Sequence, residues 1–599
     1  MRILGVSCDY HDAAAAVVID GEVVAAAEEE RFSRLKHDNA LPELAIASCL
    51  ATAGITADDI DVVVFHEKPL VVMSRVLAAR QRRGPSALGS FVRDFPVLLR
   101  RNLLISYRID KLLHRLGATH SPTFVYSEHH LSHASAAFFP SPFETAAILT
   151  VDGIGEWATA TIGQGTRHRI EIHTEQRYPN SLGLLYSLAT VWCGFEANDG
   201  EYKVMGLAPF GTPRYADALA SIVDLHDDGS VDINAKDARW WSGDPRRMRR
   251  LVELFDGPPR APGEPLTERE WDLARSVQDL VEEAMLRMAT EAHRITGESD
   301  LCLAGGVALN CVANGRLRRE GPFDDIWVQP AAGDAGSAIG GALWYWHDNQ
   351  GNTRTRPKPT DAVDLRPDGM SGAALGPAFE GDEVAAWLDA QGVDHERVAD
   401  LTERSERVAE HLADGSIVGW FEGRMEFGPR ALGHRSILAD PRRTDVQRDI
   451  NIRVKGRESF RPFAPAVLWS HASEWFEMDA PSPYMLFTFD VREDKRLPVA
   501  EDPTDPVERV QIPRSQIPAC THVDHSARVQ TVHPETAPAF HALLSAFHAK
   551  TGCPVLLNTS FNVAGEPIVC TPDDALATAR TAELDVLVLD EFIVLLTPS

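Results

Sequence analysis

Basic residues are scarce in this chain relative to acidic ones. The 599 residues include 59 Lys and Arg against 87 Asp and Glu, which gives a formal net charge of −28. A surface this acidic repels phosphate backbones, so nucleic acid is not expected as a partner. A small phosphorylated ligand is still compatible with this charge, because a local pocket can be basic on an acidic protein.

The chain also has few cysteines, and no two of them form a C-x-x-C pair. The eight cysteines are scattered, so the sequence contains no zinc ribbon or dithiol redox motif, and a reducing compartment is expected. No apolar run is long enough to span a bilayer. The N-terminus, Met1–Gly5, lacks the apolar stretch of a signal peptide. We therefore expect a cytoplasmic protein without a membrane partner.

Strand patterns repeat within the first part of the chain. Three short segments near the N-terminus are predicted strands: Ile3–Ser7, Ala13–Ile19 and Glu22–Ala27. The Asp20-Gly21 dipeptide between the last two is typical of a tight hairpin. The same order of strand, acidic turn and strand returns later, at Ala147–Val151, Asp152–Gly155 and Thr159–Gly163. Two copies of this pattern predict a duplicated α/β domain.

A change of composition separates this part from a second α/β region. A long amphipathic helix is predicted over Glu268–Ile295. Residues 348–380 are rich in Gly, Pro, Thr and Asp and show no periodicity, so they are predicted to be a linker. We place the domains at residues 1–360 and 381–599. Packing of the last strands against the first domain is the alternative to their packing within the second. Residues 495–520 are predicted to form a loop.

Two histidines four residues apart indicate a metal site. On a helix, His129 and His133 would lie on one face. Asp152 and Asp334 each lie in a turn that can point a carboxylate into a cleft. Two imidazoles with two carboxylates suit iron or another divalent metal better than a thiolate zinc site. The alternative, that these histidines only hydrogen-bond within the fold, is equally compatible with the sequence.

Phosphate-binding elements are predicted from the acidic turns and from a glycine pair. In a duplicated fold, the turns Asp9–Asp12 and Asp152–Gly155 would face each other, and backbone N–H groups in such turns can hold phosphates. Gly305-Gly306 follows a predicted strand and permits close approach of a nucleotide. A glycine pair alone is a weak signal, since most are only turns.

Arginine and glycine are concentrated in Gly423–Ser436, and Lys455, Arg457 and Arg461 follow. Arginine forks in glycine-rich loops suit an anionic phosphate or carbamate. The apolar residues among these arginines argue against a merely solvated basic surface. Asn558–Asn562 follows a predicted buried strand, where binding loops are common.

Together these motifs resemble those of the carbamoyltransferases of the nodulation and antibiotic-tailoring type. The matching segments are, in chain order, His11-Asp12, Glu29–Arg31, residues 129–142, Glu201–Gly206, Gly305–Asn310, Gly423–Ser436 and Asn558–Asn562. The resemblance covers nearly the whole chain, and many separated motifs in order are far more specific than one. Two positions depart from the family: alanine follows Asp12 where serine is frequent, and His525 stands where glycine is more usual.

The resemblance implies both a fold and a reaction. The N-terminal part is expected to have the duplicated actin/Hsp70-like ATPase fold of Kae1, and the C-terminal part a YrdC-like α/β fold. Carbamoyl phosphate and ATP would give carbamoyl-adenylate in the second domain. In the first domain a metal would hold this intermediate while an acceptor hydroxyl attacks. The implied cofactors are a divalent metal, iron first, and Mg with ATP, and the co-substrates are ATP and carbamoyl phosphate.

The family motifs also assign candidate site residues. The implied metal ligands are His129, His133, Asp152 and Asp334. The candidates for binding nucleotide or carbamoyl-adenylate in the first domain are Asp12, Gly153, Glu201, Lys203, Gly305, Gly306 and Asn310. The candidates for binding carbamoyl phosphate and ATP in the second domain are Arg424, Arg430, Arg435, Lys455, Arg461, Arg528, Asn558, Ser560 and Asn562.

Transfer to an alcohol requires a base, because a hydroxyl is a poor nucleophile until its proton is removed. Histidine side chains titrate near neutral pH and are the usual choice of base, and His11 lies in the first acidic turn, where Asp9 and Asp12 flank it. We predict that His11 is the general base, with Asp9 as the next candidate, and that Lys36 neutralises the adenylate phosphate. The alternative is that His11 only hydrogen-bonds the substrate.

Two other functions compete with this prediction. A sugar-kinase-like ATPase on the same duplicated fold would explain the acidic turns, but not the arginine-rich second region. A binding protein of a tRNA-threonylcarbamoylation assembly would need a basic patch. The expected partner is a small molecule with an acceptor hydroxyl, and the resemblance implies a natural product. Acceptor pockets are built from variable loops, so the sequence leaves open which compound is the acceptor. A homodimer is left open.

Overall fold

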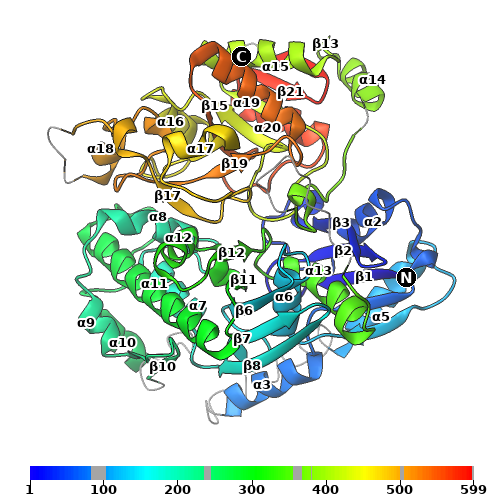
Figure 1. Cartoon of the computed structure of the whole chain (residues 1–599), viewed down its shortest axis with the longest axis vertical. Helices are drawn as coiled ribbons and strands as arrows, with labels where there is room; N and C mark the ends of the chain where they lie inside the picture. Colours follow the sequence, from blue (N-terminus) through cyan, green and yellow to red (C-terminus); the bar gives the residue numbers. More distant parts are fainter. Residues whose placement is uncertain are drawn as a thin grey trace. The chain divides into compact units, whose positions relative to one another are not determined.

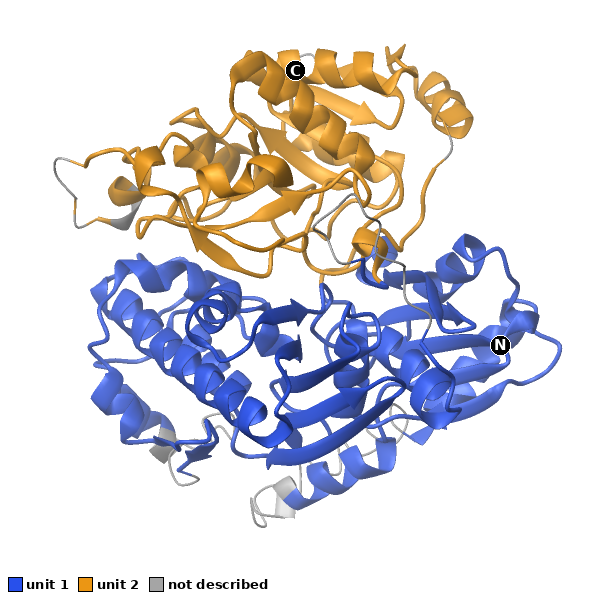
Figure 2. Ribbon diagram, in the orientation of Figure 1, with its two compact units in different colours: residues 1–33, 37–358, 367–369 blue, residues 34–36, 359–366, 370–599 orange. Residues whose placement is uncertain are grey.

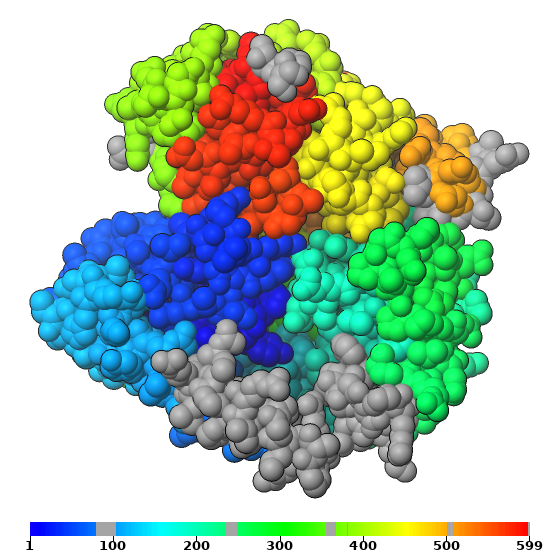
Figure 3. All heavy atoms as spheres, turned by 180° about the vertical axis from the view of Figure 1, so that it is seen from behind, coloured from blue at the N-terminus to red at the C-terminus, as the bar shows by residue number. Residues whose placement is uncertain are grey.

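A computed structural model of the chain describes residues 1–81, 103–234, 245–354, 367–379, 381–499, 503 and 505–596. The chain forms two compact units, coloured separately in Figure 2. The first comprises residues 1–33, 37–358 and 367–369, and the second comprises residues 34–36, 359–366 and 370–599. The residues of each unit can be followed by colour over the molecular surface in Figure 3.

The first unit contains two five-stranded sheets with the same topology (Figure 1). One sheet has the order β3-β2-β1-β4-β5, with β1 Arg2–Ser7, β2 Ala14–Ile19, β3 Glu22–Glu28, β4 Val62–Phe65 and β5 Thr123–Tyr126. The other has the order β8-β7-β6-β11-β12, with β6 Thr145–Val151, β7 Ala158–Thr166, β8 Arg169–Arg177, β11 Asp300–Ala304 and β12 Asp325–Val328. In each sheet the first strand pairs antiparallel with the second and parallel with the fourth. The predicted fold class, an α/β chain whose first part is a duplicated actin/Hsp70-like domain, is confirmed.

Helices accompany both sheets of the first unit. They are α1 Glu30–Ser33, α2 Glu43–Thr52, α3 Pro69–Gln81, α5 Ile105–Arg115, α6 His129–Phe138, α7 Leu182–Trp192, α8 Glu201–Leu207, α9 Ala216–Ala220, α10 Pro245–Leu254, α11 Glu268–Thr296, α12 Cys311–Glu320 and α13 Gly336–Trp344. A short hairpin, β9 Val223–Leu225 and β10 Val231–Ile233, completes the unit. The long helix predicted over Glu268–Ile295 is confirmed as α11, which begins with a capping box between Thr267 and Glu270.

Helix α13 packs closely against both β1 and α6 because two glycines leave room for it. A Cβ on Gly340 would collide with the backbone of Ser132 on α6, and a Cβ on Gly5 of β1 would collide with the backbone of Ala338. This packing places the N-terminus of α13 close to α6. The helix that carries His129 therefore packs directly against the helix that follows Asp334.

The second unit is built on an eight-stranded mixed sheet with the order β13-β22-β21-β14-β15-β20-β16-β19. Its strands are β13 Glu396–Arg397, β14 Val418–Phe421, β15 Arg435–Ala439, β16 Ala464–Leu468, β19 Gln530–Val532, β20 Val555–Ser560, β21 Val586–Leu589 and β22 Phe592–Leu595. Strands β17 Thr488–Asp490 and β18 Ser526–Arg528 form a separate pair. The helices are α14 Gly381–Gln391, α15 Leu401–Ala413, α16 Val446–Asp449, α17 Trp469–Trp475, α18 Pro506–Gln511, α19 Pro538–Thr551 and α20 Pro572–Thr581.

Some local predictions need correction. The last strands belong to the sheet of the second unit, where β21 pairs in parallel with β14 and β22 pairs with β21. The segment 495–520 is not only a loop: α18 forms within it, where the Asp505 carboxylate accepts a hydrogen bond from the Glu508 N–H at 3.0 Å. Of the predicted linker 348–380, residues 355–366 and 380 lie outside the described residues.

The departure at His525 has a backbone explanation. His525 has a φ of 67°, in the left-handed region that glycine adopts most easily. Glycine at this position would remove that strain. Among the helices that the structure describes, none is long and apolar enough to cross a membrane.

Candidate functional site

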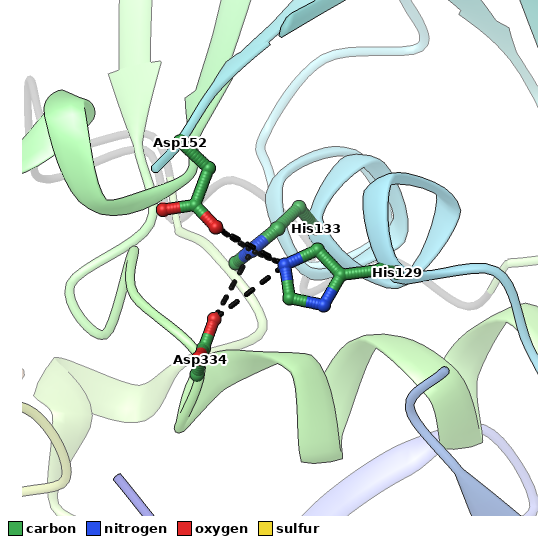
Figure 4. Close-up of side chains that lie close together, drawn as sticks. All are labelled: His129, His133, Asp152 and Asp334. Atoms are coloured by element: carbon green, nitrogen blue, oxygen red, sulfur yellow. Dashed lines mark hydrogen bonds and ion pairs between the residues drawn. The ribbon is translucent and has the colours of Figure 1, made fainter. Parts of the chain in front are cut away.

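Four side chains from three parts of the first unit converge on one point (Figure 4). His129 and His133 lie one turn apart on α6, Asp152 follows β6, and Asp334 precedes α13. The Nε2 atoms of the two histidines are 3.1 Å apart. Asp152 Oδ2 is 3.1 Å from His129 Nε2 and 3.5 Å from His133 Nε2, and Asp334 Oδ1 is 3.6 Å from both nitrogens. All four residues are buried.

The residues of this cluster fit a divalent metal ion. Ligand atoms bound at about 2.0–2.2 Å in tetrahedral or octahedral geometry lie roughly 3.0–3.5 Å from one another. The distances within the cluster match this spacing. Imidazole nitrogens with carboxylate oxygens are also a common ligand set for divalent transition metals. The structure thus brings together the four residues that the sequence nominated, as a candidate metal centre.

Neighbouring groups orient these four side chains. The Gly306 N–H donates to Asp152 Oδ1 at 3.0 Å, so Oδ2 is the oxygen turned toward the histidines. Ser337 Oγ lies 3.3 Å from His133 Nδ1. The Glu156 carboxylate accepts hydrogen bonds from the His129 N–H at 3.0 and 3.1 Å, which caps the start of α6. Partners of this kind fix the ring orientation and the tautomer of a metal-binding histidine.

The electrostatics of the cluster favour positive charge. Burial alone would lower the pKa of His129, but the hydrogen bond to Asp152 and the charge of Asp334 outweigh it and raise that pKa to about 10. Hydrogen bonds from both histidines likewise outweigh burial at Asp152 and hold the pKa of its carboxyl well below the usual range. Protons and a metal ion compete for the same atoms, so metal affinity should fall as the pH falls.

Sequence reasoning missed two residues beside this cluster. The His66 ring lies 5.5 Å from the His129 ring, between centroids. Burial, followed by the charge of His129, lowers the pKa of His66 to about 3, so this imidazole is neutral. Burial raises the pKa of Glu67 to about 7. The charge of His129 opposes this shift, and the charges of Glu156 and Asp334 increase it. Their position in the chain could have identified them, because His66-Glu67 directly follows β4 and site residues are common where strands end.

The predicted nucleotide-binding residues of the first unit have different surroundings. Gly305 has a φ of 91°, and a Cβ there would collide with the Val151 backbone, so this turn needs glycine. The Gly306 N–H is used by Asp152, whereas a Cβ on Gly153 would meet nothing within 4 Å. An open backbone of this kind at Gly153 leaves room for a ligand.

Two other candidates are engaged within the fold. Asn310 Oδ1 accepts from the Ala313 N–H at 3.0 Å and caps α12, and its amide donates to Gln278 at 2.9 Å. Glu201 Oε1 accepts from Ser187 Oγ at 2.7 Å and from the Asn198 N–H at 2.9 Å. These bonds shape the loops around the site.

The first acidic turn and the loop that carries His37 form a second cluster, made of His11, Asp12 and His37. Asp12 lies between the two imidazoles, with Oδ2 2.9 Å from His11 Nδ1 and Oδ1 2.9 Å from His37 Nδ1. Asp9 has a φ of 72° and its Oδ2 accepts from Arg108 Nη1 at 2.5 Å. Sequence reasoning missed His37, although this histidine directly follows Lys36, which was a predicted site residue.

Lys36 and Lys203 complete the candidates of the N-terminal region. Lys36 groups with the second unit in the structure, together with residues 34 and 35. Its predicted role in neutralising the adenylate stays a prediction. Lys203 Nζ lies 3.9 Å from Asp199 Oδ2 and 5.4 Å from the centroid of the Phe195 ring.

In the second unit, a buried lysine organises the predicted donor site. Lys455 Nζ donates to the Ser560 carbonyl at 2.5 Å, to the Asn562 carbonyl at 2.9 Å and to Asn562 Oδ1 at 2.7 Å. Burial lowers the pKa of Lys455 well below its usual value, and the charges of Arg457 and Arg461 lower it further. The structure therefore brings Lys455, Ser560 and Asn562 together, with Arg461 near enough to act on the lysine electrostatically.

The other predicted residues of the second unit divide between two settings. Arg435 is fully buried, donates to the carbonyls of Glu422, Gly423 and His434, and lies 3.5 Å from the Phe421 ring centroid. Arg424 also donates to backbone carbonyls, and the Asn558 amide donates to Gln530 Oε1 at 2.8 Å. These contacts favour a structural role for the three residues. The remaining three are partly exposed: Arg430, Arg461 and Arg528.

Comparison with known families accounts for both units. Residues 2–343 match the family described as carbamoyltransferase N-terminus, and residues 409–595 match the family described as carbamoyltransferase C-terminus. The chain therefore belongs to the carbamoyltransferase family. It is a transferase of the type represented by the nodulation proteins and the cephem O-carbamoyltransferases. The kinase and tRNA-assembly alternatives are set aside by these matches.

Individual relatives span most of the chain. An uncharacterized protein of Synechocystis is 49% identical over 601 residues, 99% of this chain and 96% of that one. The nodulation protein NolNO of Sinorhizobium fredii is 38% identical over 98% of this chain and 79% of its own length. The 3'-hydroxymethylcephem-O-carbamoyltransferase of Amycolatopsis lactamdurans is 29% identical, over 74% of this chain and 76% of its own length.

Proposed function

We propose that this chain carries a carbamoyl group from carbamoyl phosphate to a hydroxyl group of a small molecule through carbamoyl-adenylate. In the first reaction, carbamoyl phosphate, ATP and water give carbamoyl-adenylate, pyrophosphate and phosphate. In the second, the acceptor oxygen bonds to the carbamoyl carbon, the bond from that carbon to the adenylate oxygen breaks, and AMP leaves. The acceptor proton goes to a base of the protein.

The observation that carries this proposal is the convergence of His129, His133, Asp152 and Asp334 beside the turn that holds His11. The charge of Asp334 helps to raise the pKa of His11, so the two clusters lie within electrostatic range of each other in the first unit. A divalent metal held by these four residues, with iron as our proposal, would supply positive charge to polarise the carbonyl and neutralise the adenylate phosphate. The open backbone at Gly153 supports phosphate binding at the same place.

A single assay tests the proposed sequence of reactions. The protein is incubated with ATP and carbamoyl phosphate, and the nucleotide products and pyrophosphate are measured. We expect pyrophosphate that depends on carbamoyl phosphate, and AMP once an acceptor is added. Release of ADP instead would show kinase chemistry and would refute the carbamoyl-adenylate route.

We assign activation of the donor to the second unit, and Arg430 tests this assignment. Its partly exposed side chain can form a charge-assisted fork with an anionic donor. In Arg430→Ala, pyrophosphate release that depends on carbamoyl phosphate should fall by about ten- to a hundredfold. Transfer from synthetic carbamoyl-adenylate should persist.

The matched control for this variant is Arg492→Ala, which removes an exposed arginine paired with Asp494. It should leave both reactions unchanged. Normal pyrophosphate release by Arg430→Ala would mean that Arg430 has no part in activation.

His11 is proposed as the base that accepts the proton of the acceptor. Burial would lower the pKa of His11, but the hydrogen bond to Asp12 outweighs burial and the pKa is raised. Because Nδ1 faces Asp12, Nε2 is the nitrogen left to take the proton. His11→Asn keeps a polar side chain but no basic nitrogen, so the transfer rate should fall about a hundredfold or more. Pyrophosphate release should be unaffected, and a variant that transfers at the normal rate would move the base elsewhere.

We propose a natural-product hydroxyl as the acceptor class. The relatives that act on a cephem and in nodulation support this class. A mass-shift screen of hydroxylated natural products with ATP and carbamoyl phosphate tests it directly. A product carrying one carbamoyl group identifies the acceptor, whereas modification of nitrogen rather than oxygen would contradict O-transfer.

A further inference from the structure

His37 has a carboxylate at each of its ring nitrogens. Its Nδ1 is 2.9 Å from Asp12 Oδ1, and its Nε2 is 3.1 Å from Asp199 Oδ1. An ionised carboxylate only accepts hydrogen bonds, so both nitrogens of His37 act as donors and the ring is an imidazolium. Asp12 accepts a second hydrogen bond, from His11 Nδ1 at 2.9 Å. The four side chains form one chain in the order Asp199, His37, Asp12 and His11.

A buried ion-pair ladder holds His37 at this place. The His37 backbone N–H donates to Glu30 Oε2 at 2.8 Å, and Glu30 Oε1 lies 2.8 Å from Arg31 Nη1. Arg31 is itself buried and lies 2.5 Å from Glu28 Oε2. His37 has a φ of 54°, so its backbone adopts a conformation that needs such support. The charged residues at the end of β3 and the start of α1 therefore position His37.

The loop after His37 is also joined to the first acidic turn by backbone hydrogen bonds. The Ala13 N–H donates to the Asp38 carbonyl at 3.0 Å, and the Asp9 N–H donates to the Asn39 carbonyl at 2.8 Å. The loop and the turn thus run side by side and hold Asp12 between the two imidazoles. A displacement of His37 would be transmitted to Asp12.

We propose that His37 is a positioning residue for the transfer step: by bridging Asp199 and Asp12, it orients the Asp12 carboxylate so that His11 keeps its proton on Nδ1 and presents Nε2 to the acceptor hydroxyl. The proposal deepens the proposed function and rests on His11 being the base. His37 itself touches no reacting atom in this arrangement. Its effect on the reaction passes through Asp12.

The charge of His37 also tunes His11. Burial alone would lower the pKa of His37, but the hydrogen bonds to Asp12 and Asp199 raise it to about 10, so the ring is positive at neutral pH. Glu30 adds to this shift. The two rings are 4.7 Å apart between centroids, and the charge of His37 lowers the pKa of His11 while Asp12 and Asp334 raise it.

The sign of the expected pH effect follows from these charges. A neutral residue at position 37 removes a repulsion that opposes protonation of His11, so the pKa of His11 should rise. His11 serves as a base only when it is unprotonated. The acid limb of the pH–rate profile should therefore move to higher pH, by about one pH unit.

His37→Gln tests the proposal in the full-length protein. Transfer from synthetic carbamoyl-adenylate should show a kcat about tenfold lower, the acid limb shifted to higher pH, and an unchanged KM for the acceptor. Pyrophosphate release and bound metal should be unaltered. The matched control is His226→Gln, which removes an exposed histidine paired with Asp232 and should change neither quantity.

A measurement without turnover separates this proposal from the role of His11. The pH dependence of His11 carbethoxylation by diethyl pyrocarbonate, read by peptide mass spectrometry, gives its titration midpoint directly. We expect this midpoint to lie at a higher pH in His37→Gln than in the protein without the substitution. If His37→Gln does not fold, Asp199→Asn replaces it and should lower kcat for transfer without changing pyrophosphate release.

Three results would overturn the proposal in distinguishable ways. A normal rate, pH profile and carbethoxylation midpoint in His37→Gln, with His11→Asn inactive, would refute the positioning role and leave the base assignment intact. A fully active His11→Asn would refute the base and the positioning role together. Loss of one equivalent of metal in His37→Gln would show that His11, Asp12 and His37 hold an ion instead.

Discussion

His133→Ala is expected to lose bound metal and carbamoyl transfer together. The side chain is fully buried, and its Nε2 lies within 3.6 Å of three other candidate ligand atoms. Removing one of four ligands opens the site and leaves two carboxylates with less positive charge between them. Metal-ion catalysis contributes several kcal/mol to a transition state, so transfer should fall about a thousandfold or more. Elemental analysis and transfer from synthetic carbamoyl-adenylate measure the two effects.

The control for His133→Ala is another buried histidine of the same unit. His347 Nδ1 donates a hydrogen bond to the Asn352 carbonyl at 3.0 Å, and the residue is buried outside the metal cluster. His347→Gln should keep its metal, which separates loss of a ligand from general damage to the fold. Asp334→Asn provides a second variant with a smaller change of volume. Full metal occupancy in both His133→Ala and Asp334→Asn would refute the metal centre.

Lys455→Met is expected to abolish activation of carbamoyl phosphate while sparing transfer. Lys455 is the buried lysine at the Ser560–Asn562 loop, and leaving a bound anionic donor without its buried cationic partner costs about 3–5 kcal/mol. Pyrophosphate release that depends on carbamoyl phosphate should therefore fall by about two to three orders of magnitude. Transfer from supplied carbamoyl-adenylate should continue, which shows that the first unit is intact.

Lys455 also predicts a pH dependence in the unmodified protein. Because burial, Arg457 and Arg461 depress its pKa, the lysine loses its proton at a lower pH than an exposed lysine. An anionic donor binds the protonated form, so the KM for carbamoyl phosphate should rise as the pH rises. The control Lys550→Met removes an exposed lysine paired with Glu410 and should change neither quantity. Unchanged pyrophosphate release in Lys455→Met would remove this lysine from the donor site.

The strand repeat and the helical histidine pair could be predicted because their signals are local. The Asp20-Gly21 hairpin and its later counterpart repeat over short segments, and the spacing of His129 and His133 defines one helix face wherever that helix lies. The apolar stripe of α11 is equally local. The conclusions that follow from these patterns, a duplicated α/β unit and two imidazoles on one face, needed no knowledge of distant contacts.

The sequence by itself determined the order of the elements, the nomination of Asp152 and Asp334, and the resemblance to a transferase family. Only the tertiary structure decided which nominated side chains face the site. Arg435 lies in a predicted binding motif, yet its guanidinium donates to backbone carbonyls. His37 was not predicted, yet it joins Asp12 to Asp199 by hydrogen bonds. These outcomes depend on hydrogen bonds between residues far apart in the chain. Periodicity reports which face of an element is buried, but not which distant loop supplies the partner for a polar side chain.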